Sequence, residues 1–349
     1  MSPPLRSLLT RVQPAGVILL ARNISEAGQT RALLRDCQAC VATPLFTCVD
    51  MEGGRVDRFR DVIGPASSAA AVFATGDRNL FRRHGRIIGE CCRALGLNTD
   101  LAPVVDLALP ASRQVMSSRA VSADPREAVV YARAFLAGLR EANVIGCGKH
   151  FPGLGEARLD THHELPQVAK PWKELWREDL YPFRALRRQF PMVLVNHASY
   201  PSVTHDAKPA SLSEKWITGV LCKKIGYRGL VLSDDLEMGA IVKSMLPGEA
   251  AVEHIRAGGD LCLICHTEEL ITRSWEALRR EAVSDRKFAL RARDAVQRVL
   301  AFKRTHRSQL RPARTPSSMR VRKLARQLWE CAEQVRLEAI SSRTEQEPA

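Results

Sequence analysis

The stretch from residue 148 to residue 166 packs many side chains that could do chemistry into a short length of chain. It reads GKHFPGLGEARLDTHHELP and contains three histidines, three glycines, two glutamates, a lysine and an aspartate. The glycines lack the third position of a dinucleotide fingerprint, and the Gly-Lys-Ser/Thr of a P-loop is absent. His163-Glu164 could begin an H-E-x-x-H zinc helix, but Pro166 breaks that helix, so zinc would need ligands from elsewhere in the chain.

What remains is a glycine-rich loop after a strand, which we expect to be mobile and which carries Asp160-x-His162. A carboxylate beside an imidazole orients the ring and favours its protonated form. Such a pair predicts a general acid that can protonate a leaving group near neutral pH. The alternative is a surface aspartate and histidine that are neighbours by chance.

Two further stretches place carboxylates at strand ends. In GLVLSDDLEMGA, Asp234 could be a nucleophile facing a cleft, while Asp235 could cap the helix that follows. In VDMEGGRVDRF, Asp50 could accept hydrogen bonds from sugar hydroxyls, to which Arg55 and Arg58 could donate. The alternatives are helix capping for the first stretch and a turn with an ion pair for the second.

Short apolar runs alternate with segments of helical period, such as residues 77–95 and 124–142. This alternation predicts a parallel sheet covered by helices, and the length favours a (β/α)8 TIM-type barrel over an open doubly wound sheet. Only seven strand candidates are found, so we expect a barrel that lacks or alters its first strand. The seven runs are 16–21, 45–49, 97–107, 144–148, 192–196, 229–233 and 260–265.

Polar side chains end four of these buried runs, where a structural protein would have no reason to place charge. Because all strand carboxyl ends of a parallel barrel open on one face, this pattern predicts an enzyme with its site on that face. The side chains are Asp50, Lys149, His150, His197 and Asp234.

Composition sets limits on the other function classes. Of the formal net charge of +14, the segment 303–349 contributes 11 − 5 = +6. No nucleic-acid module is recognisable, so we expect a solvated basic surface and no nucleic-acid partner. We see no signal peptide and no membrane span, and the ten cysteines lie mostly in apolar runs, which together predict a cytoplasmic protein. The two C-x-x-C pairs, Cys37/Cys40 and Cys262/Cys265, lie in a helical and a strand-like pattern, which is unfavourable for zinc.

Beyond residue 302 the composition changes. Residues 303–318 are typical of a basic linker, and residues 321–340 have apolar side chains at helical spacing. We therefore expect a barrel over 1–302, followed by a linker and an amphipathic helix with a basic face over 303–349. The role of this helix is left open between docking on the barrel, replacing missing cover and contacting a partner.

Several blocks together resemble family 3 glycoside hydrolases, and within them the single-domain bacterial β-N-acetylglucosaminidases of peptidoglycan recycling. They occur in the family's order over about residues 14–302. The motifs KHFPG…DTH and SDDLEM, from the fourth and the last block, are the most specific. The blocks are VDMEGGRVDRF, LAPVVDL, SRAVSADP, GKHFPGLGEARLDTHHELP, VNHASYPSVTHDAKPASLS and GYRGLVLSDDLEMGAI.

This resemblance implies a retaining two-step glycosidase without cofactor or metal, acting on a terminal N-acetylglucosamine. It implies Asp234 as nucleophile, His162 as acid/base and Asp160 as the partner of His162. It also implies a set of residues that hold the sugar: Asp50, Arg58, Arg119, Lys149 and His150.

The chain departs from the family pattern in three places. Leu154 stands where PGHG has a histidine, so we expect altered loop closure rather than loss of chemistry, and Met51 replaces a common glutamine. We also expect the strand and helix that usually precede GVILLARN to be absent. Other hypotheses therefore stay open: a β-glucosidase or phosphorylase of the same family, a non-catalytic amino-sugar-binding barrel, and a nucleic-acid or anionic-surface binder acting through the tail. The oligomeric state is not predicted.

Overall fold

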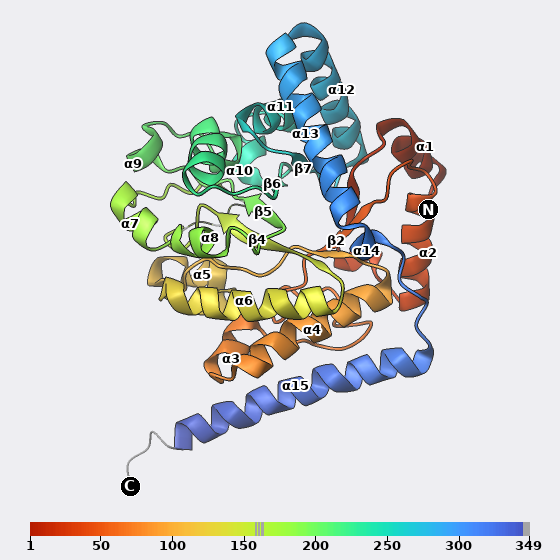
Figure 1. Ribbon diagram of the computed structural model, residues 1–349, viewed down its shortest axis with the longest axis vertical. Coiled ribbons are helices and arrows are strands. Elements are labelled where there is room, and N and C mark those ends of the chain that lie inside the picture. Colours follow the sequence, from red (N-terminus) through yellow and green to blue (C-terminus); the bar gives the residue numbers. More distant parts are fainter. Residues whose placement is uncertain (158, 160, 162–163, 345–349) are drawn as a thin grey trace.

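The computed structural model describes residues 1–157, 159, 161 and 164–344. Its centre is one parallel sheet in which the strands follow the order of the chain (Figure 1). Each strand lies within or across one of the apolar runs predicted from the sequence. The seven strands are β1 Gly16–Leu19, β2 Phe46–Val49, β3 Thr99–Asp100, β4 Ile145–Phe151, β5 Met192–Val195, β6 Leu230–Asp235 and β7 Leu261–Leu263.

The sheet is an open arc rather than a closed ring. Among the described residues β1 pairs only with β2 and β7 only with β6, so no strand joins the two ends. We call this place the β1–β7 seam. All residues of β2, β4 and β5 are buried, whereas β1 and β7 are largely half-buried, as expected at the edges. The expected number of seven strands is confirmed, and the eighth strand of a complete barrel is absent from the part of the chain described. The expected absence of a helix before the first strand is wrong, because α1 (Pro3–Val12) precedes β1.

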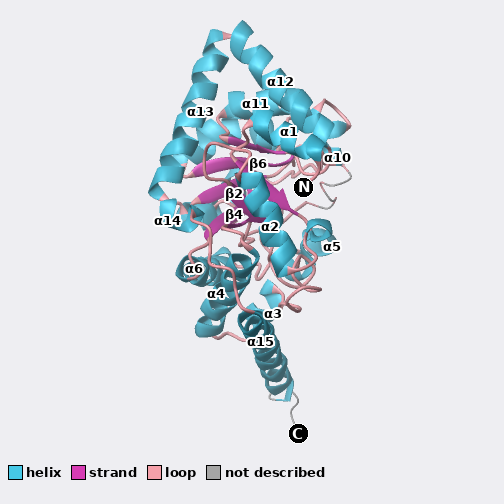
Figure 2. Ribbon diagram, turned by 90° about the vertical axis from the view of Figure 1, so that its right-hand side faces the viewer, coloured by secondary structure: helices cyan, strands magenta, loops and turns pink. Residues whose placement is uncertain are grey.

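Helices flank the strands of this arc, with α4 and α6 below them and α11, α12 and α13 above them in Figure 2. Short 3-10 helices (η1–η4) and a π-helix (η5) complete the connections. The longer or functionally placed helices are α1 Pro3–Val12, α2 Ala27–Gln38, α3 Ala69–Ala74, α4 Arg78–Leu95, α5 Arg113–Met116, α6 Pro125–Glu141, α7 Trp172–Arg177, α8 Tyr181–Leu186, α9 Pro201–Thr204, α10 Gly239–Val242, α11 Pro247–Ala257, α12 Glu268–Ser284, α13 Arg286–Thr305, α14 Arg307–Leu310, α15 Ser318–Thr344, η1 Ala21–Asn23, η2 Pro110–Ser112, η3 Ser117–Arg119, η4 Ala210–Leu212 and η5 Lys215–Lys224.

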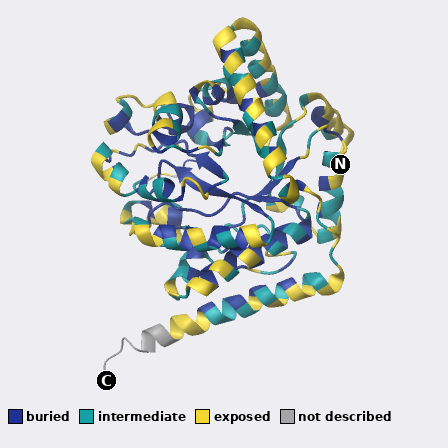
Figure 3. Cartoon of the chain, in the orientation of Figure 1, coloured by how far each residue is buried: buried dark blue, intermediate teal, exposed yellow. Residues whose placement is uncertain are grey.

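Local sequence explains where the two predicted helices begin and end. The Asp77 side chain accepts the N–H of Asn79 before α4, and Gly96, with φ of 87°, ends that helix in the left-handed conformation. Asp124 caps α6 in the same way, with Pro125 in its first turn. Both helices are confirmed, and their packed faces hold the β3–β4 side of the sheet in place (Figure 3).

The predicted amphipathic helix near the C-terminus is also confirmed, as α15. It docks on α3 and α4 through an apolar face, and Arg320 pairs with Glu90 at 3.0 Å. The expected linker over 303–318 is wrong in its first half, because α13 continues to Thr305 and α14 follows it. A domain boundary at residue 302 stays a prediction. The buried side chains of α15 are Leu324, Leu328, Cys331 and Val335.

The ten cysteines are all free thiols, seven of them buried. Within the described ranges, no three metal-binding side chains gather into a group. Among the same residues, no helix has both the length and the apolar character needed to cross a bilayer.

Candidate active site

The centre of the site lies at the carboxyl end of β4. All residues of this strand are buried, and its last positions include Lys149 and His150. Both residues are almost completely withdrawn from solvent, since only 2% of the surface of Lys149 and 6% of that of His150 is exposed. Because an unpaired buried ammonium group is costly, Lys149 must find acidic partners nearby.

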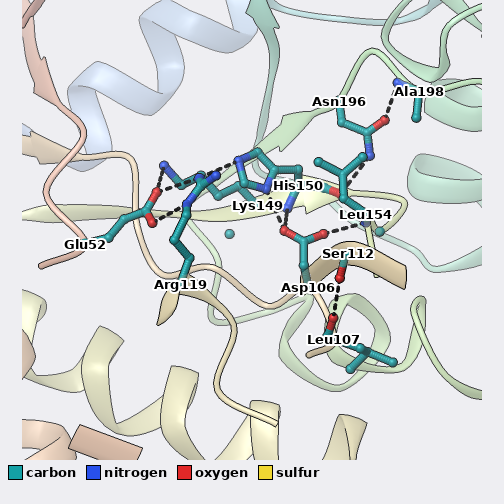
Figure 4. A network of polar contacts seen from close by, with 12 residues as sticks. Glu52, Asp106, Leu107, Ser112, Arg119, Lys149, His150, Leu154, Asn196 and Ala198 are labelled. Atoms are coloured by element: carbon teal, nitrogen blue, oxygen red, sulfur yellow. Dashed lines mark hydrogen bonds and ion pairs between the residues drawn. The ribbon is translucent and has the colours of Figure 1, made fainter. Parts of the chain in front are cut away.

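Glu52 supplies the main partner, together with Asp50. Lys149 Nζ lies 2.7 Å from Asp50 Oδ1 and 2.6 Å from Glu52 Oε1. Arg119 donates to the same glutamate in a bidentate manner, from Nε to Oε2 at 2.7 Å and from Nη2 to Oε1 at 2.9 Å (Figure 4). Glu52 therefore bridges two cations that come from β4 and from η3.

Burial alone would raise the pKa of Glu52, but the charges of Arg119 and Lys149 outweigh it and hold the pKa well below its usual range. Burial would likewise lower the pKa of Lys149 and Arg119, and the neighbouring carboxylates instead raise the pKa of both. All three groups are therefore charged at neutral pH.

His150 joins this network to a second buried carboxylate. Arg119 Nη2 lies 3.2 Å from His150 Nε2, and His150 Nδ1 lies 2.6 Å from Asp106 Oδ2. The backbone N–H groups of His150 and Leu154 also donate to Asp106, at 3.1 and 2.7 Å. Asp50, Arg119, Lys149 and His150, predicted from the sequence to hold a sugar, are thus brought together.

Asp234 lies near the end of β6, and its carboxylate interacts electrostatically with His150 and Lys149 of this network. Burial raises the pKa of Asp234, but His197, His150, the N–H of Asp235 and Lys149 together lower it below its ordinary value. Its Oδ1 accepts the Asp235 N–H at 2.9 Å, and no lysine or arginine of the described residues forms an ion pair with it. The carboxylate is therefore ionised without a salt bridge to any lysine or arginine that the structure describes.

Asp235 has a different role from the one expected. Its Oδ1 accepts the N–H of Glu237 at 3.1 Å and its Oδ2 lies 3.1 Å from His266 Nε2, so it stabilises a turn instead of capping a helix. The next helix, α10, has Met238 as its N-cap without a side-chain hydrogen bond. Burial and the charge of Glu237 raise the pKa of Asp235 to about 6, although the hydrogen bond from the Glu237 N–H acts to lower it.

Two predicted residues lie outside the described residues, and a third, Arg58, has no recorded contact with the other described site residues. Asp160 and His162 are not among the described positions, so their predicted roles are untested. Arg58 is half-buried in the segment after β2, and its Nε has no hydrogen-bond partner there. None of the contacts found among the described residues joins Arg58 to Lys149, His150 or Arg119.

Leu154 and Met51, the two departures in the sequence pattern, are both buried. Leu154 is 2% exposed and belongs to the same apolar cluster as Ala157 and Tyr200. Met51 is completely buried, and its N–H donates to Asp100 Oδ1 at 2.9 Å. Burial raises the pKa of Asp100 well above its usual range, and its hydrogen bond with the Met51 N–H helps to hold the segment of Asp50 and Glu52.

Sequence reasoning missed Glu52, Asp106 and Asp100 as members of the site. Glu52 stands two positions after Asp50, and Asp106 ends the apolar run of LAPVVDL. The rule that polar residues at strand ends reach the site would have found both had it been applied a few residues further along. His197 met that rule, and its Nδ1 lies 2.6 Å from Ser211 Oγ.

The arrangement combines two functions in one place. The Lys149–Glu52–Arg119 group and His150 present fixed donors and acceptors suited to hydroxyl groups, and an ionised carboxylate lies within their field. Such a site can hold a sugar and attack it with an oxygen nucleophile.

Comparison with known proteins decides the family. Residues 1–302 match the model of the glycosyl hydrolase family 3 N-terminal domain. The chain belongs to glycoside hydrolase family 3. It is 37% identical over 264 residues to a β-hexosaminidase of Bordetella avium, which covers 73% of this chain and 74% of that protein. A β-hexosaminidase of Thiobacillus denitrificans is 36% identical over 262 residues, 73% of this chain and 72% of its own length.

Solved structures of this family give the same result. A family 3 β-N-acetylglucosaminidase of a Paenibacillus species superposes with a TM-score of 0.86 at 32% identity, covering 95% of this chain and 65% of that one. The β-N-acetylglucosaminidase of Thermotoga maritima gives 0.75 at 29% identity, with 93% and 67% covered. A β-glucoside phosphorylase at 22% identity, with a TM-score of 0.81, shares the fold. Like its family 3 relatives, the chain is a glycoside hydrolase with a TIM-barrel-like α/β fold, and the relatives support activity on N-acetylglucosaminides.

Proposed function

We propose that this protein is a retaining exo-glycosidase that removes terminal β-linked N-acetylglucosamine from muropeptides or related sugars. The observation that carries the proposal is Asp234, an ionised carboxylate beside the Lys149–His150 end of β4 and free of any ion pair with the described lysines and arginines. A nucleophile must keep its electron pair available, and a salt bridge would withdraw it.

In the first step, an oxygen of Asp234 attacks the anomeric carbon of the sugar. The glycosidic bond breaks, and the leaving oxygen takes a proton from His162, which Asp160 orients. In the second step, His162 takes a proton from water, the water oxygen attacks the anomeric carbon, and Asp234 leaves as a carboxylate. His162 and Asp160 enter this mechanism as predictions from the sequence.

The buried wall formed by Glu52, Arg119, Lys149 and His150 supports the binding half of the proposal. Its donors are fixed by ion pairs before any ligand arrives, so a sugar would not have to order them. Relatives named β-hexosaminidase and β-N-acetylglucosaminidase support the choice of sugar. A role in peptidoglycan recycling and a cytoplasmic location belong to the same proposal.

The experiment is to incubate the full chain with p-nitrophenyl N-acetyl-β-glucosaminide, with and without inorganic phosphate, and to analyse the products. We expect free N-acetylglucosamine, first released as the β-anomer, in both cases. A sugar phosphate appearing only with phosphate would replace hydrolysis by phosphorolysis. Binding of N-acetylglucosamine by calorimetry without turnover of this or the p-nitrophenyl glucoside substrate would refute the enzyme and leave a sugar-binding barrel.

A further inference from the structure

Asp106 lies between two parts of the site that are consecutive along the chain but have different tasks. Its carboxylate is fully buried, and each oxygen has its own partner (Figure 4). Oδ2 accepts hydrogen bonds from the backbone N–H of His150 at 3.1 Å and from the His150 ring at 2.6 Å. Oδ1 accepts the N–H of Leu154 at 2.7 Å.

The contacts of His150 assign the tautomer of its ring. Arg119 Nη2 lies 3.2 Å from Nε2, and a guanidinium group can only donate. Nε2 must therefore accept, so the proton of the neutral ring is on Nδ1 and points to Asp106. By accepting the Nδ1 proton, Asp106 thus leaves His150 Nε2 as a hydrogen-bond acceptor for Arg119.

The other oxygen fixes the point at which the chain leaves β4. Leu154 follows Gly153, whose carbonyl accepts a hydrogen bond from Tyr200 Oη at 2.6 Å. The Leu154 side chain is buried in the apolar cluster, and the predicted acid/base pair follows it in the sequence. The direction in which that segment starts is therefore set by the Asp106 and Tyr200 hydrogen bonds.

We propose that Asp106 is a positioning residue that aligns the sugar-holding ring of His150 with the start of the segment that carries Asp160 and His162. The proposal rests on the proposed glycosidase function. A carboxylate is a rigid group, so its two oxygens cannot move independently. Because Asp106 is withdrawn from water, a lost hydrogen bond on either side would not be replaced by solvent.

The test uses Asp106→Asn, in which one of the two acceptor oxygens becomes an NH2 donor that cannot accept from His150 or Leu154. The substrates are aryl N-acetyl-β-glucosaminides whose phenols range from strongly to weakly acidic. A weakly acidic phenol depends more on protonation by the acid/base. We therefore expect kcat/KM to fall about 10-fold for the best leaving group and at least about 10-fold further for the poorest.

The matched control is Asp260→Asn. Asp260 is also a fully buried carboxylate that accepts a backbone N–H, from Val231 at 3.0 Å, and it pairs with Arg291 and Arg298, away from His150 and Leu154. This variant should melt at a lower temperature and keep the leaving-group dependence of the natural protein. An equal change of leaving-group dependence in both variants would mean that general loosening, not alignment, causes it.

Hydrogen exchange gives a readout that does not depend on turnover. In the natural protein, saturating N-acetylglucosamine should slow exchange in the peptide 152–157, and in Asp106→Asn this slowing should be lost. Unchanged slowing together with an unchanged leaving-group dependence overturns the proposal. If the natural protein cleaves no substrate but shows the slowing, and Asp106→Asn loses it, the glycosidase function fails and the alignment stands. Should the Asn variant not fold, Asp106→Glu keeps both acceptors but displaces them, and the same two readouts apply.

Discussion

The two walls of the site handle charge in opposite ways. One wall, which we call the holding wall, lies where β2, β4 and η3 end. There Lys149 and Arg119 both pair with Glu52, and Lys149 also pairs with Asp50. On the other wall, the reacting wall at the end of β6, Asp234 has no ion pair with a described lysine or arginine. Among the described residues Asp235 pairs only with His266, whose side chain is 51% exposed.

This difference fits two tasks: one wall would hold the sugar, and the other would react with it. Paired charges are rigid and already desolvated, which suits a surface that must recognise hydroxyl groups in one orientation. An ionised carboxylate that accepts one backbone N–H and has no ion pair with a described lysine or arginine keeps lone pairs for a new bond. Substitutions on the two walls should therefore fail in distinguishable ways.

The largest effect is expected on the reacting wall. Asp234→Ala removes the oxygen that we propose forms the bond to the sugar, and kcat should fall by roughly 10³-fold or more. Because the donors of the other wall stay in place, binding of N-acetylglucosamine measured by calorimetry should change far less. A variant that retains turnover would remove Asp234 from the mechanism.

Glu52→Gln tests the holding wall. Loss of one partner in a buried ion-pair network costs about 3 kcal/mol in free energy of unfolding, and we expect KM to rise more than kcat falls. The advantage of the natural protein should be complete above the unfolded pKa of 4.5 and be lost as acid protonates Glu52, whose folded pKa is lower. Urea unfolding at a series of pH values measures this.

A surface ion pair provides the control for that experiment. Glu281 pairs with Arg256 while 31% of its side chain stays exposed, so Glu281→Gln should cost less than about 1 kcal/mol. If the two variants lose the same stability, burial of the Glu52 network has no special value.

Asp235 should give a pH dependence of opposite sign. Its folded pKa of about 6 lies above the unfolded value of 3.8, so the folded protein holds the proton more tightly. The stability that this brings is complete below pH 3.8 and is lost as the pH rises through 6. Relative to Asp235→Asn, the natural protein should therefore lose stability across this interval, and a pH-independent difference would contradict the assignment.

The smallest effect on catalysis is expected at Leu154, where the chain leaves β4. A histidine here would bring a polar ring into an apolar cluster, at a cost of about 1–3 kcal/mol in unfolding free energy, while kcat should change little. Leu154→Met, which conserves volume, should cost less than about 1.5 kcal/mol. A large loss of kcat at full stability would show that Leu154 is part of the chemistry.

The sequence was sufficient for the sheet and for most of the holding wall, because both follow from local patterns. Apolar runs located all the strands, and a polar residue at the end of a run located Asp50, Lys149, His150 and Asp234. Glu52 and Asp106 were missed because the rule was applied only to the position directly after each run, and their partners 97 and 44 positions away in the chain leave no local pattern. The role of Asp235 was misjudged because an aspartate that stabilises a turn and an aspartate that caps a helix occur in the same sequence pattern.

The β1–β7 seam has a mechanical consequence. A closed ring of strands cannot widen without breaking hydrogen bonds between strands, whereas an open arc can flex outward with all its ladders intact. Across the seam Arg22 donates to the carbonyl oxygen of Cys265 at 3.0 Å, and further out Arg11 donates to Thr272 Oγ1 at 3.0 Å. The seam is thus held by hydrogen bonds from long, flexible arginine side chains, whereas the segment that follows β2 is joined to β4 by the buried ion pair of Glu52 with Lys149.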